Sequence, residues 1–259
     1  PASTPAPGPA PPPTTGQLAV LADIHGNWPA LQAVLAELAR RGVAAGIVLG
    51  DIVGYGPHPR ACIEALRERG FRVIKGNHDN ALARGIPQQG FSRQARWALE
   101  WSAPHLDEAD RRWLDELPLY LQEPDFMAVH GAPQDRSYFN AYVYRMTYED
   151  NLDYMAGHDI RVCFHGHTHV QGYYYRRGEV QNFATASVLD LDTVAHCLIC
   201  PGSVGQPRSK YTGAEFALLD RASRRVSFHR LDYDLERTID DMASEGFPEA
   251  LMARLRVGQ

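Results

Sequence analysis

The sequence predicts an α/β fold with a largely parallel sheet, and three observations carry this prediction. Short apolar segments typical of buried strands alternate with segments of helical spacing through the first half of the chain. Five of the apolar segments end in aspartate, asparagine or histidine, at the carboxyl ends of strands, where open α/β sheets hold their sites. With 259 residues, 44% of them hydrophobic, the chain is long enough to bury a large core.

The chain is expected to form one domain preceded by a tail. Residues 1–16 are rich in proline, alanine and threonine and carry no charged side chain. Such a composition buries little apolar surface and favours extended conformations. We therefore expect a disordered tail over residues 1–16 and a single domain over residues 17–259.

The first half of the chain repeats a strand, a polar turn and a helix. We expect strands over residues 18–22, 46–49 and 71–75, and helices from about residue 29 and over residues 59–69. Pro29 suits the first turn of its helix, and apolar residues recur there at the spacing of one buried face. This alternation predicts a parallel α/β core. Two helical stretches between residues 97 and 117 are expected to cover the sheet.

The second half of the chain changes character. Expected strands over residues 125–129 and 160–164 again lead to polar residues, whereas from residue 172 short strand-like segments follow one another closely. These segments fall at residues 173–175, 180–183, 195–199, 215–219 and 226–231. Their close succession indicates hairpins and a more antiparallel arrangement. Helices over about residues 235–242 and 248–255 are expected to close the chain.

Composition argues against several classes of protein. The formal net charge of −5 gives no basic surface for extended nucleic-acid binding, although a small nucleotide is compatible with it. No apolar stretch approaches the roughly 18 residues of a membrane-spanning helix. Four cysteines in a chain of this length do not form a disulfide framework and indicate a reducing compartment. We expect a soluble, cytoplasmic protein of unknown oligomeric state.

The polar residues at the strand ends have the chemistry of metal ligands. They are Asp23, His25, Asp51, Asn77, His130, His167 and His169. Carboxylate, amide and imidazole groups without a thiolate suit manganese, iron, zinc or nickel, with manganese favoured, and suit calcium or copper(I) poorly. One buried histidine is usually a hydrogen-bonded core residue, but seven such residues are too many for one ion. They fit two divalent ions about 3.5–4 Å apart that share a bridging carboxylate.

The order of these motifs resembles that of the calcineurin-like metallophosphoesterase superfamily. The motifs are Asp23-Ile-His25, Gly50-Asp51, Gly76-Asn-His-Asp79, His130-Gly131 and Gly166-His-Thr-His169. Within it, residues 23–27, 50–57 and 201–208 resemble the small bacterial branch related to YfcE-type phosphodiesterases. The resemblance covers about residues 17–235. It implies an αββα sandwich of two mixed sheets flanked by helices, with a dimetal site at the carboxyl ends of the strands.

The resemblance also implies a role for each site residue. Asp23, His25 and His169 would hold the first metal, Asn77, His130 and His167 the second, and Asp51 would bridge them. His78 would be the catalytic residue, which donates a proton to the leaving oxygen or stabilises the phosphoryl charge. The nucleophile would be a hydroxide held between the ions, since a metal can lower the pKa of water to about 7. His165 and Asp79 match no ligand position and would act, if at all, behind the ligands.

One departure from relatives bears on the substrate. Serine/threonine protein phosphatases of this superfamily carry Asp-Arg-Gly after the bridging aspartate, and this chain has Gly54-Tyr55-Gly56 there. Arg208 is an alternative cation for the phosphate, although its ordinary interpretation is a solvated loop charge. Asn27, Tyr55 and Arg208 are therefore the expected substrate-binding residues. The aromatic segment 138–148 either stacks a base or packs its own loop, and we favour packing.

These observations predict a dimetal-dependent phosphoester hydrolase, favoured to be a phosphodiesterase for nucleotide-type or other small phosphodiesters. The alternatives are a phosphomonoesterase or a serine/threonine protein phosphatase. A non-catalytic scaffold with the same fold is the remaining hypothesis, and it would be expected to lose His78 or several ligands. All of these residues are present.

Overall fold

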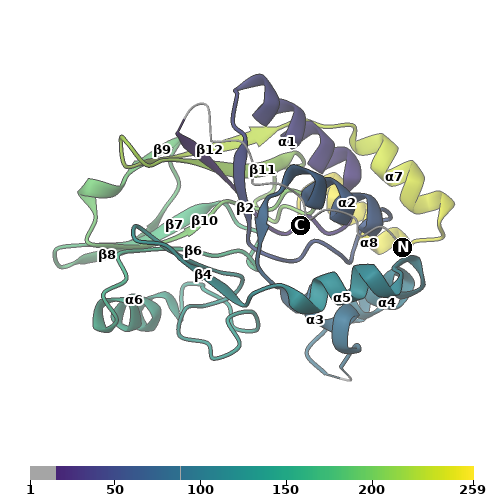
Figure 1. The fold of residues 1–259 in the computed structure, drawn as a ribbon, viewed down its shortest axis with the longest axis horizontal. Helices are drawn as coiled ribbons and strands as arrows, with labels where there is room; N and C mark the ends of the chain where they lie inside the picture. Colours follow the sequence, from purple (N-terminus) through teal and green to yellow (C-terminus); the bar gives the residue numbers. More distant parts are fainter. Residues whose placement is uncertain (1–15, 88) are drawn as a thin grey trace, which may run out of the picture.

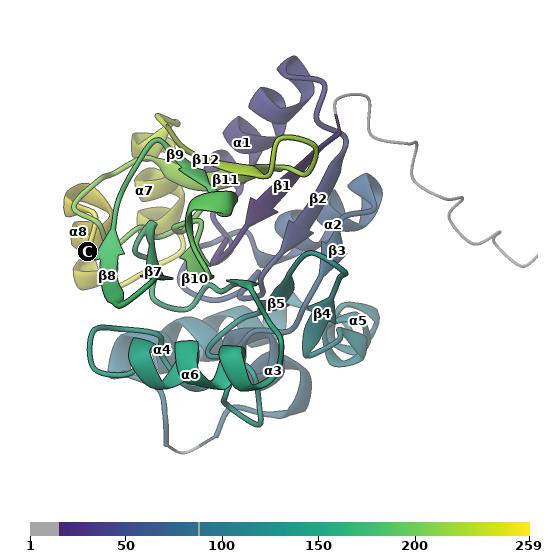
Figure 2. The same ribbon diagram turned by 90° about the vertical axis from the view of Figure 1, so that its left-hand side faces the viewer.

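The computed structural model describes residues 16–87 and 89–259. The tail expected over residues 1–16 therefore lies outside the described residues, except for Gly16. In the described part of the chain, two six-stranded mixed sheets face each other and helices cover their outer faces (Figures 1 and 2). This is the αββα sandwich that the sequence and its family resemblance predict.

The first sheet combines three parallel strands with an antiparallel hairpin and an edge strand. Its order is β3 (Arg72–Val73), β2 (Ala45–Val48), β1 (Gln17–Leu21), β11 (Ala214–Asp220), β12 (Arg225–Leu231) and β9 (Val188–Asp190). Central strand β1 pairs parallel with β2, where Leu18 faces Ala45, and antiparallel with β11, where Leu18 faces Leu219. The first sheet thus combines strands from the two ends of the chain.

The second sheet also combines parallel and antiparallel strands. Its order is β4 (Tyr120–Gln122), β5 (Met127–Val129), β6 (Val162–Phe164), β10 (His196–Cys200), β7 (Gly172–Arg177) and β8 (Val180–Ala184). Strands β5, β6 and β10 are parallel, whereas β4, β7 and β8 pair antiparallel. Each sheet therefore has a block of parallel strands whose carboxyl ends can share one site.

The helices complete the outer layers. They are α1 (Trp28–Arg40), α2 (Pro59–Arg69), α3 (Asn77–Arg84), α4 (Arg93–Ser102), α5 (Glu108–Glu116), α6 (Tyr148–Gly157), α7 (Leu235–Ser244) and α8 (Glu249–Val257). Helices α1 and α2 lie over the first sheet and α6 over the second (Figure 2). Two short 3-10 turns lie at Ala103–His105 and Leu191–Thr193.

Strand β1 shows how the sequence pattern builds the core. Successive side chains of a strand point to opposite faces of the sheet. Leu18 and Val20 join the apolar layer between the sheets, which also contains Phe164 of the second sheet. Ala19 and Leu21 join the layer under the helices of the first sheet. A strand buried on both faces reads as the continuous apolar run seen in the sequence.

Helices α4, α7 and α8 share an apolar cluster of their own. Ile239 and Leu251 of the last two helices share an apolar cluster with Ala95 of α4. Trp97 and Trp101 pack on Phe247, their ring centroids 4.9 and 4.7 Å from the phenyl ring. Leu99 of α4 also joins the apolar layer of the first sheet, together with Leu106 and Leu114, as expected for the 97–117 stretch. The packing among the three helices brings α8 to the carboxyl edge of the strands.

Most expected strands and helices lie within a few residues of their predicted ends, and four elements were not expected. These are β4, β9, α3 and α6. The strands β4 and β9 have three residues each and lie at sheet edges, too short for a pattern in the sequence. Helix α3 begins inside a ligand motif, at Asn77, and α6 begins at the end of the aromatic segment, at Tyr148.

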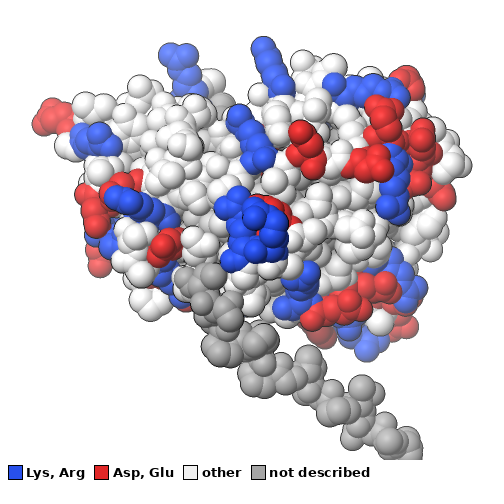
Figure 3. All heavy atoms as spheres, turned by 90° about the horizontal axis from the view of Figure 1, so that it is seen from above, with Lys and Arg blue, Asp and Glu red and all other residues white. Residues whose placement is uncertain are grey.

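The surface agrees with the acidic composition. On the face shown in Figure 3, Lys and Arg side chains are interspersed with Asp and Glu side chains, so this face carries no continuous basic region among the described residues. Within the described ranges, no helix combines the length and the apolar character needed to cross a membrane.

Candidate metal centre

The strand ends bring the seven expected ligand residues together at one edge of the sandwich. They come from the turns after β1, β2, β5 and β6 and from the first residue of α3. Their atoms form groups within 4.8 Å of one another, among them Asp23–His25–His169 and Asp51–His130–His167. We call the seven residues Asp23, His25, Asp51, Asn77, His130, His167 and His169 the ligand cluster. The six histidines and aspartates in it are all buried.

Asp51 lies between the two groups. Its Oδ2 atom is 3.7 Å from Nε2 of His25 and 3.4 Å from Nε2 of His130. Its Oδ1 atom accepts a hydrogen bond of 2.9 Å from the backbone N–H of His78. One carboxylate oxygen thus faces both groups, while the other is held by the start of α3.

The remaining members complete each group. In the first, Nε2 of His169 lies 3.2 Å from both Oδ1 of Asp23 and Nε2 of His25. In the second, Nε2 of His130 lies 3.1 Å from Oδ1 of Asn77 and 3.1 Å from Nδ1 of His167. These separations suit atoms that share one ion, because ligand atoms about 2.0–2.2 Å from an ion lie about 3 Å apart.

Backbone carbonyl groups fix the orientation of three of these histidines. Nδ1 of His25 donates to the carbonyl oxygen of Val53 at 3.0 Å. In the same way, Nδ1 of His130 donates to Leu49 at 2.7 Å, and Nδ1 of His169 donates to Gln206 at 2.6 Å. A carbonyl oxygen only accepts, so each Nδ1 carries the proton, and in a neutral ring Nε2 presents a lone pair to the cluster. Such backbone partners are typical behind metal ligands.

The arrangement fits a cation better than it fits an empty hydrogen-bonded core. Neutral His25 and His169 direct two Nε2 lone pairs at each other across 3.2 Å, with no proton to share. Nε2 of His167 is buried and has no hydrogen-bond partner among the described residues. Buried acceptors that face each other are unfavourable without a positive group between them. The cluster and its donor atoms therefore indicate a dinuclear metal site.

Charge and burial set the protonation of the cluster before a metal binds. Burial, with the charge of His130 second, lowers the pKa of His167 to about 3. Burial also acts to lower the pKa of His130, but the charge of Asp51 outweighs it and raises that pKa to about 9. Burial acts to raise the pKa of Asp23, and His169 reverses this and holds it at about 2. Burial also acts to raise the pKa of Asp51, and the charge of His130 reverses this and lowers it. Both carboxylates are therefore ionised at neutral pH, as ligands must be.

The backbone of the cluster is strained. Asp23, His25, Asp51, His167 and His169 have φ values of 54°, 51°, 54°, 64° and 59°, respectively. This left-handed region is uncommon for residues other than glycine and costs on the order of 1–3 kcal/mol per residue. Strain of this kind persists only where the surrounding structure enforces it, and it is concentrated at functional sites.

Asp79 holds the loop that carries Asp51. Its carboxylate accepts hydrogen bonds from the backbone N–H groups of Asp51 at 2.7 Å, Ile52 at 2.9 Å and Gly76 at 2.9 Å. Burial and then the charge of Asp51 raise the pKa of Asp79 to about 7. A side chain at Gly76 would collide with the Asp51 carboxylate, so the motif needs glycine there. Asp79 therefore supports the cluster from behind, the role considered for it from the sequence.

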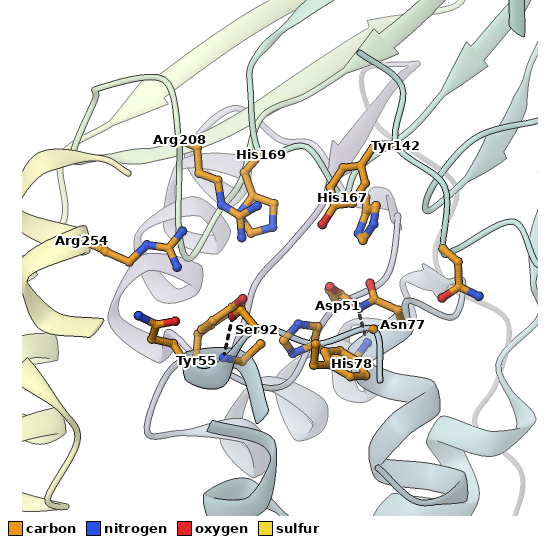
Figure 4. A pocket seen from close by; sticks show the side chains of 15 residues that line it. Asp51, Tyr55, Asn77, His78, Ser92, Tyr142, His167, His169, Arg208 and Arg254 are labelled. Carbon is orange, nitrogen blue, oxygen red and sulfur yellow. Dashed lines mark hydrogen bonds between the residues drawn. The ribbon is translucent and has the colours of Figure 1, made fainter. Parts of the chain in front are cut away.

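A cavity of about 280 Å³ opens over the ligand cluster (Figure 4). Asp51, Asn77, His167 and His169 form part of its lining. We call Tyr55, Tyr142, Arg208 and Arg254, which also line it, the cavity wall. The wall comes from the turn after β2, the 138–148 segment, the loop after β10 and helix α8.

His78 lies in the cavity beside the ligand cluster. Its ring centroid is 4.8 Å from that of His25 and 5.1 Å from that of Phe91, and its Nδ1 is buried without a hydrogen-bond partner among the described residues. Burial lowers the pKa of His78 to about 4 despite the opposing charge of Asp51. Gly54 leaves the space for this ring, because a Cβ atom there would collide with Nδ1.

The three residues expected to bind substrate do not all lie in the cavity. Tyr55 and Arg208 line the cavity, but Asn27 does not. Asn27 is buried and caps α1, where its Oδ1 accepts from the N–H of Ala30 at 3.2 Å and its Nδ2 donates to Tyr233 at 3.0 Å. Its substrate-binding role stays a prediction, and its hydrogen-bonding groups are used inside the protein. A polar residue one position before Trp-Pro was the available sign of a helix cap.

Two cavity residues, Arg254 and Tyr142, were not predicted from the sequence to lie in the cavity. Arg254 had no motif around it, since an arginine near the end of a helix is ordinary. In the aromatic segment, Val143 is buried and Tyr138 packs on the same cluster, as favoured, but the ring of Tyr142 stacks on His167 at 3.8 Å. Tyr142 thus faces the ligand cluster, and only the folded loop reveals it. His165 is buried and hydrogen-bonds to the carbonyl of Gly166.

Comparison with known proteins gives consistent matches. The sequence model of the calcineurin-like phosphoesterase family matches residues 16–171. A metallophosphoesterase structure from Sphaerobacter thermophilus is 33% identical, with 94% of this chain and 99% of that chain covered and a TM-score of 0.81. A hypothetical protein from Pyrococcus horikoshii is 26% identical, with 94% and 98% covered and a TM-score of 0.76. An uncharacterised protein of Methanocaldococcus jannaschii is 29% identical over 246 residues, 93% of this chain and 98% of the relative.

Proposed function

This chain belongs to the calcineurin-like phosphoesterase family of metal-dependent phosphoester hydrolases, and we propose that it cleaves small phosphodiesters, of nucleotide type or similar. The family predicted from the sequence motifs is thereby confirmed. The preference for diesters over monoesters, the identity of the metal and the role of each residue are parts of the proposal.

In the proposal, Asp23, His25 and His169 hold one ion, and Asn77, His130 and His167 hold the other. The position of Asp51 carries this assignment, because its Oδ2 faces both groups, at 3.7 Å from His25 and 3.4 Å from His130. Two bound ions would supply Lewis acidity for the phosphoryl oxygens and an activated water as nucleophile. Among manganese, iron, zinc and nickel, the carboxylate, amide and imidazole donors favour manganese in this proposal.

His78 acts on the phosphate from the side of the cavity. It donates a proton to the leaving oxygen or a hydrogen bond to the phosphoryl group, because its ring lies beside His25 and lines the cavity. Its orphaned Nδ1 shows that the ring has hydrogen-bonding capacity that the described residues do not use. Tyr55 and Arg208 bind substrate beside it, since both line the same cavity.

Two features of the wall support a diester substrate. Tyr55 stands where protein phosphatases of the superfamily carry an arginine, which argues against a dedicated protein phosphatase. Tyr142 places an aromatic ring against His167, so a base or another planar leaving group has a surface to contact beside the second metal group. A cytoplasmic location belongs to the proposal and is supported by cysteines that are all free thiols.

The proposal is tested with matched chromogenic substrates. Metal-stripped protein is titrated separately with manganese, nickel, iron(II), zinc and magnesium, and hydrolysis of bis-p-nitrophenyl phosphate is compared with that of p-nitrophenyl phosphate. We expect metal-dependent cleavage with a higher kcat/KM for the diester. A higher kcat/KM for the monoester would favour the phosphatase alternative. No cleavage of either substrate by protein with two bound ions would favour the scaffold.

A further inference from the structure

Two arginines of the cavity wall face the same space, and neither forms an ion pair with an Asp or Glu side chain of the described residues. We propose that Arg208 and Arg254 form a subsite for a second phosphate of the substrate, so that the substrate class is a phosphoester that carries another phosphate group. The inference rests on the proposed function for the position of the scissile phosphate. The arginine pair itself is a feature of the structure.

Arg208 is tied to the ligand cluster through its backbone. Its N–H donates to the carbonyl of His169 at 3.0 Å, and its Nη2 donates to Gln206 at 3.2 Å. Its Nε atom is buried and has no hydrogen-bond partner among the described residues. The backbone bond fixes the residue beside the first metal group, while the guanidinium keeps donors for a ligand.

Arg254 approaches the same space from helix α8. Its Nε donates to the carbonyl of Gln259 at 2.9 Å, and its Cζ lies 5.9 Å from the ring centroid of Tyr55. Burial and then the charge of Arg208 lower its pKa, which reflects two like charges directed into one cavity. Two residues later, Arg256 has an ordinary surface ion pair with Glu249 at 3.2 Å. Among the described residues, neither Arg208 nor Arg254 forms an ion pair with an Asp or Glu side chain, unlike Arg256.

The start of helix α4 adds to the positive character of this part of the cavity. Ser92, Gln94 and Ala95 line the cavity, and Ser92 is the N-cap, its hydroxyl accepting from the N–H of Ala95 at 3.2 Å. The N-terminus of a helix carries a partial positive charge and favours anions. Two guanidinium groups and a helix N-terminus facing one cavity point to an anionic ligand group.

The position of this subsite defines the substrate. In Figure 4, Arg208 and Arg254 lie toward one end of the cavity and Asn77 and Tyr142 toward the other. A scissile phosphate over the ligand cluster would therefore leave its second anionic group near the arginines. A phosphate offers enough oxygens to accept from two guanidinium forks, whereas one fork satisfies a carboxylate. The cavity volume of about 280 Å³ restricts the class to small molecules.

The test is a binding experiment that needs no turnover. Manganese-loaded protein is titrated by calorimetry with methylphosphonate, methylenediphosphonate and phosphonoacetate, which carry one phosphonate, two phosphonates, and a phosphonate with a carboxylate. We expect methylenediphosphonate to bind at least about tenfold more tightly than the other two. Equal affinity of phosphonoacetate and methylenediphosphonate would overturn the assignment to a second phosphate.

Variants separate the arginines from simple metal chelation. Arg254→Gln and Arg208→Gln should each remove most of the preference for methylenediphosphonate, and Arg254→Lys should retain part of it, because the charge remains and the fork is lost. Arg256→Gln on the same helix is the matched control and should keep the full preference. Chelation by the ions would persist in every variant, so an unchanged preference in folded Arg254→Gln and Arg208→Gln would overturn the subsite.

The two proposals fail in different ways. Arginine-dependent binding of methylenediphosphonate by a protein that hydrolyses no phosphoester would support the subsite and refute the hydrolase. Diester hydrolysis without any arginine-dependent preference would support the hydrolase and overturn the subsite. Thermal melting of each variant identifies those that fail to fold, and the lysine variant then carries the test for position 254.

Discussion

The ligand cluster and the cavity wall lie against each other but are built differently. Five of the seven cluster residues have left-handed backbone conformations, and three of its histidines are fixed by backbone carbonyl groups. Of the wall residues, only Tyr55 has a positive φ, and Arg208 keeps an unsatisfied donor. In the proposed function, the rigid cluster would supply the chemistry common to the family, and the cavity wall would select the substrate.

The ligand cluster and the cavity wall also differ in how much they oppose folding. The cluster combines left-handed backbone, buried carboxylates and lone pairs that face each other, each of which opposes folding. The apolar layers of the sandwich provide the stability that offsets this cost. Bound metal ions would relieve the electrostatic part of this cost, whereas the wall carries no comparable strain. Perturbations of the cluster should therefore have larger effects than perturbations of the wall.

Removal of the metals should have the largest effect. Ions that bind only the folded state stabilise it by about 2.7 kcal/mol per site at 100 times the Kd, or about 5 kcal/mol for two sites. At about 2–4 °C per kcal/mol for a chain of this size, the melting temperature of chelator-treated protein should rise on the order of 10 °C when manganese is restored. Calorimetric melts check this, and a shift of only a degree or two would remove the metals from the energetics of the fold.

The next effect separates chemistry from binding within the site. His78→Ala should reduce kcat by about 10²-fold or more, while the metal content stays that of the wild type, because in the proposed mechanism His78 donates to the substrate and holds no metal. Metal analysis and steady-state kinetics on the diester measure the two quantities. His58→Ala, a change at a histidine outside the cavity, is the control. Unchanged kcat in His78→Ala would remove this residue from the mechanism.

Asp79→Asn tests the support behind the cluster. The variant replaces one carboxylate oxygen by an amide N–H group that faces backbone N–H donors, so the loop of Asp51 should loosen. A loss of about 10–100-fold in metal affinity is expected, as for other partners behind metal ligands. Competition with a chelator measures it. Wild-type affinity in this variant would mean that the Asp51 loop is held by other contacts.

Tyr142→Leu should have the smallest effect. It removes the ring stacked on His167 but leaves the metal ligands and their backbone partners in place. We expect KM for an aromatic diester to rise by about 5–10-fold, in keeping with about 1–1.5 kcal/mol for a lost aromatic contact, at unchanged metal content. A loss of metal would instead assign Tyr142 to the cluster, and the distinction between cluster and wall would fail at this residue.

The sequence predicted the cluster far better than the wall, for a physical reason. Each cluster residue lies within a few residues of the end of a strand, so its position depends on local sequence and on the meeting of parallel strands at one edge. Arg254 reaches the cavity only because α8 packs on α4 and α7, an arrangement with no signal around the residue itself. Tyr142 depends on the course of its loop in the same way.

The other differences between the sequence-based expectations and the structure have similar origins. Strands β4 and β9 are three residues long and are recruited by their neighbours in the sheets, so their own pattern does not identify them. Asn27 lies within a motif of the site but is used as a helix cap that also binds Thr238 of α7 at 3.1 Å. Its position in the motif and its function in the fold are separate, and only the contacts distinguish them.

In the proposed metal centre, seven residues form two metal sites joined by Asp51. The most direct test of this arrangement is the manganese content of chelator-stripped and reconstituted protein, measured by mass spectrometry for the wild type and for Asp51→Asn. The arrangement predicts two ions per wild-type chain and a loss of affinity at both sites in Asp51→Asn, with less than one ion per chain retained. One ion per wild-type chain, or two ions at full occupancy in Asp51→Asn, would contradict it.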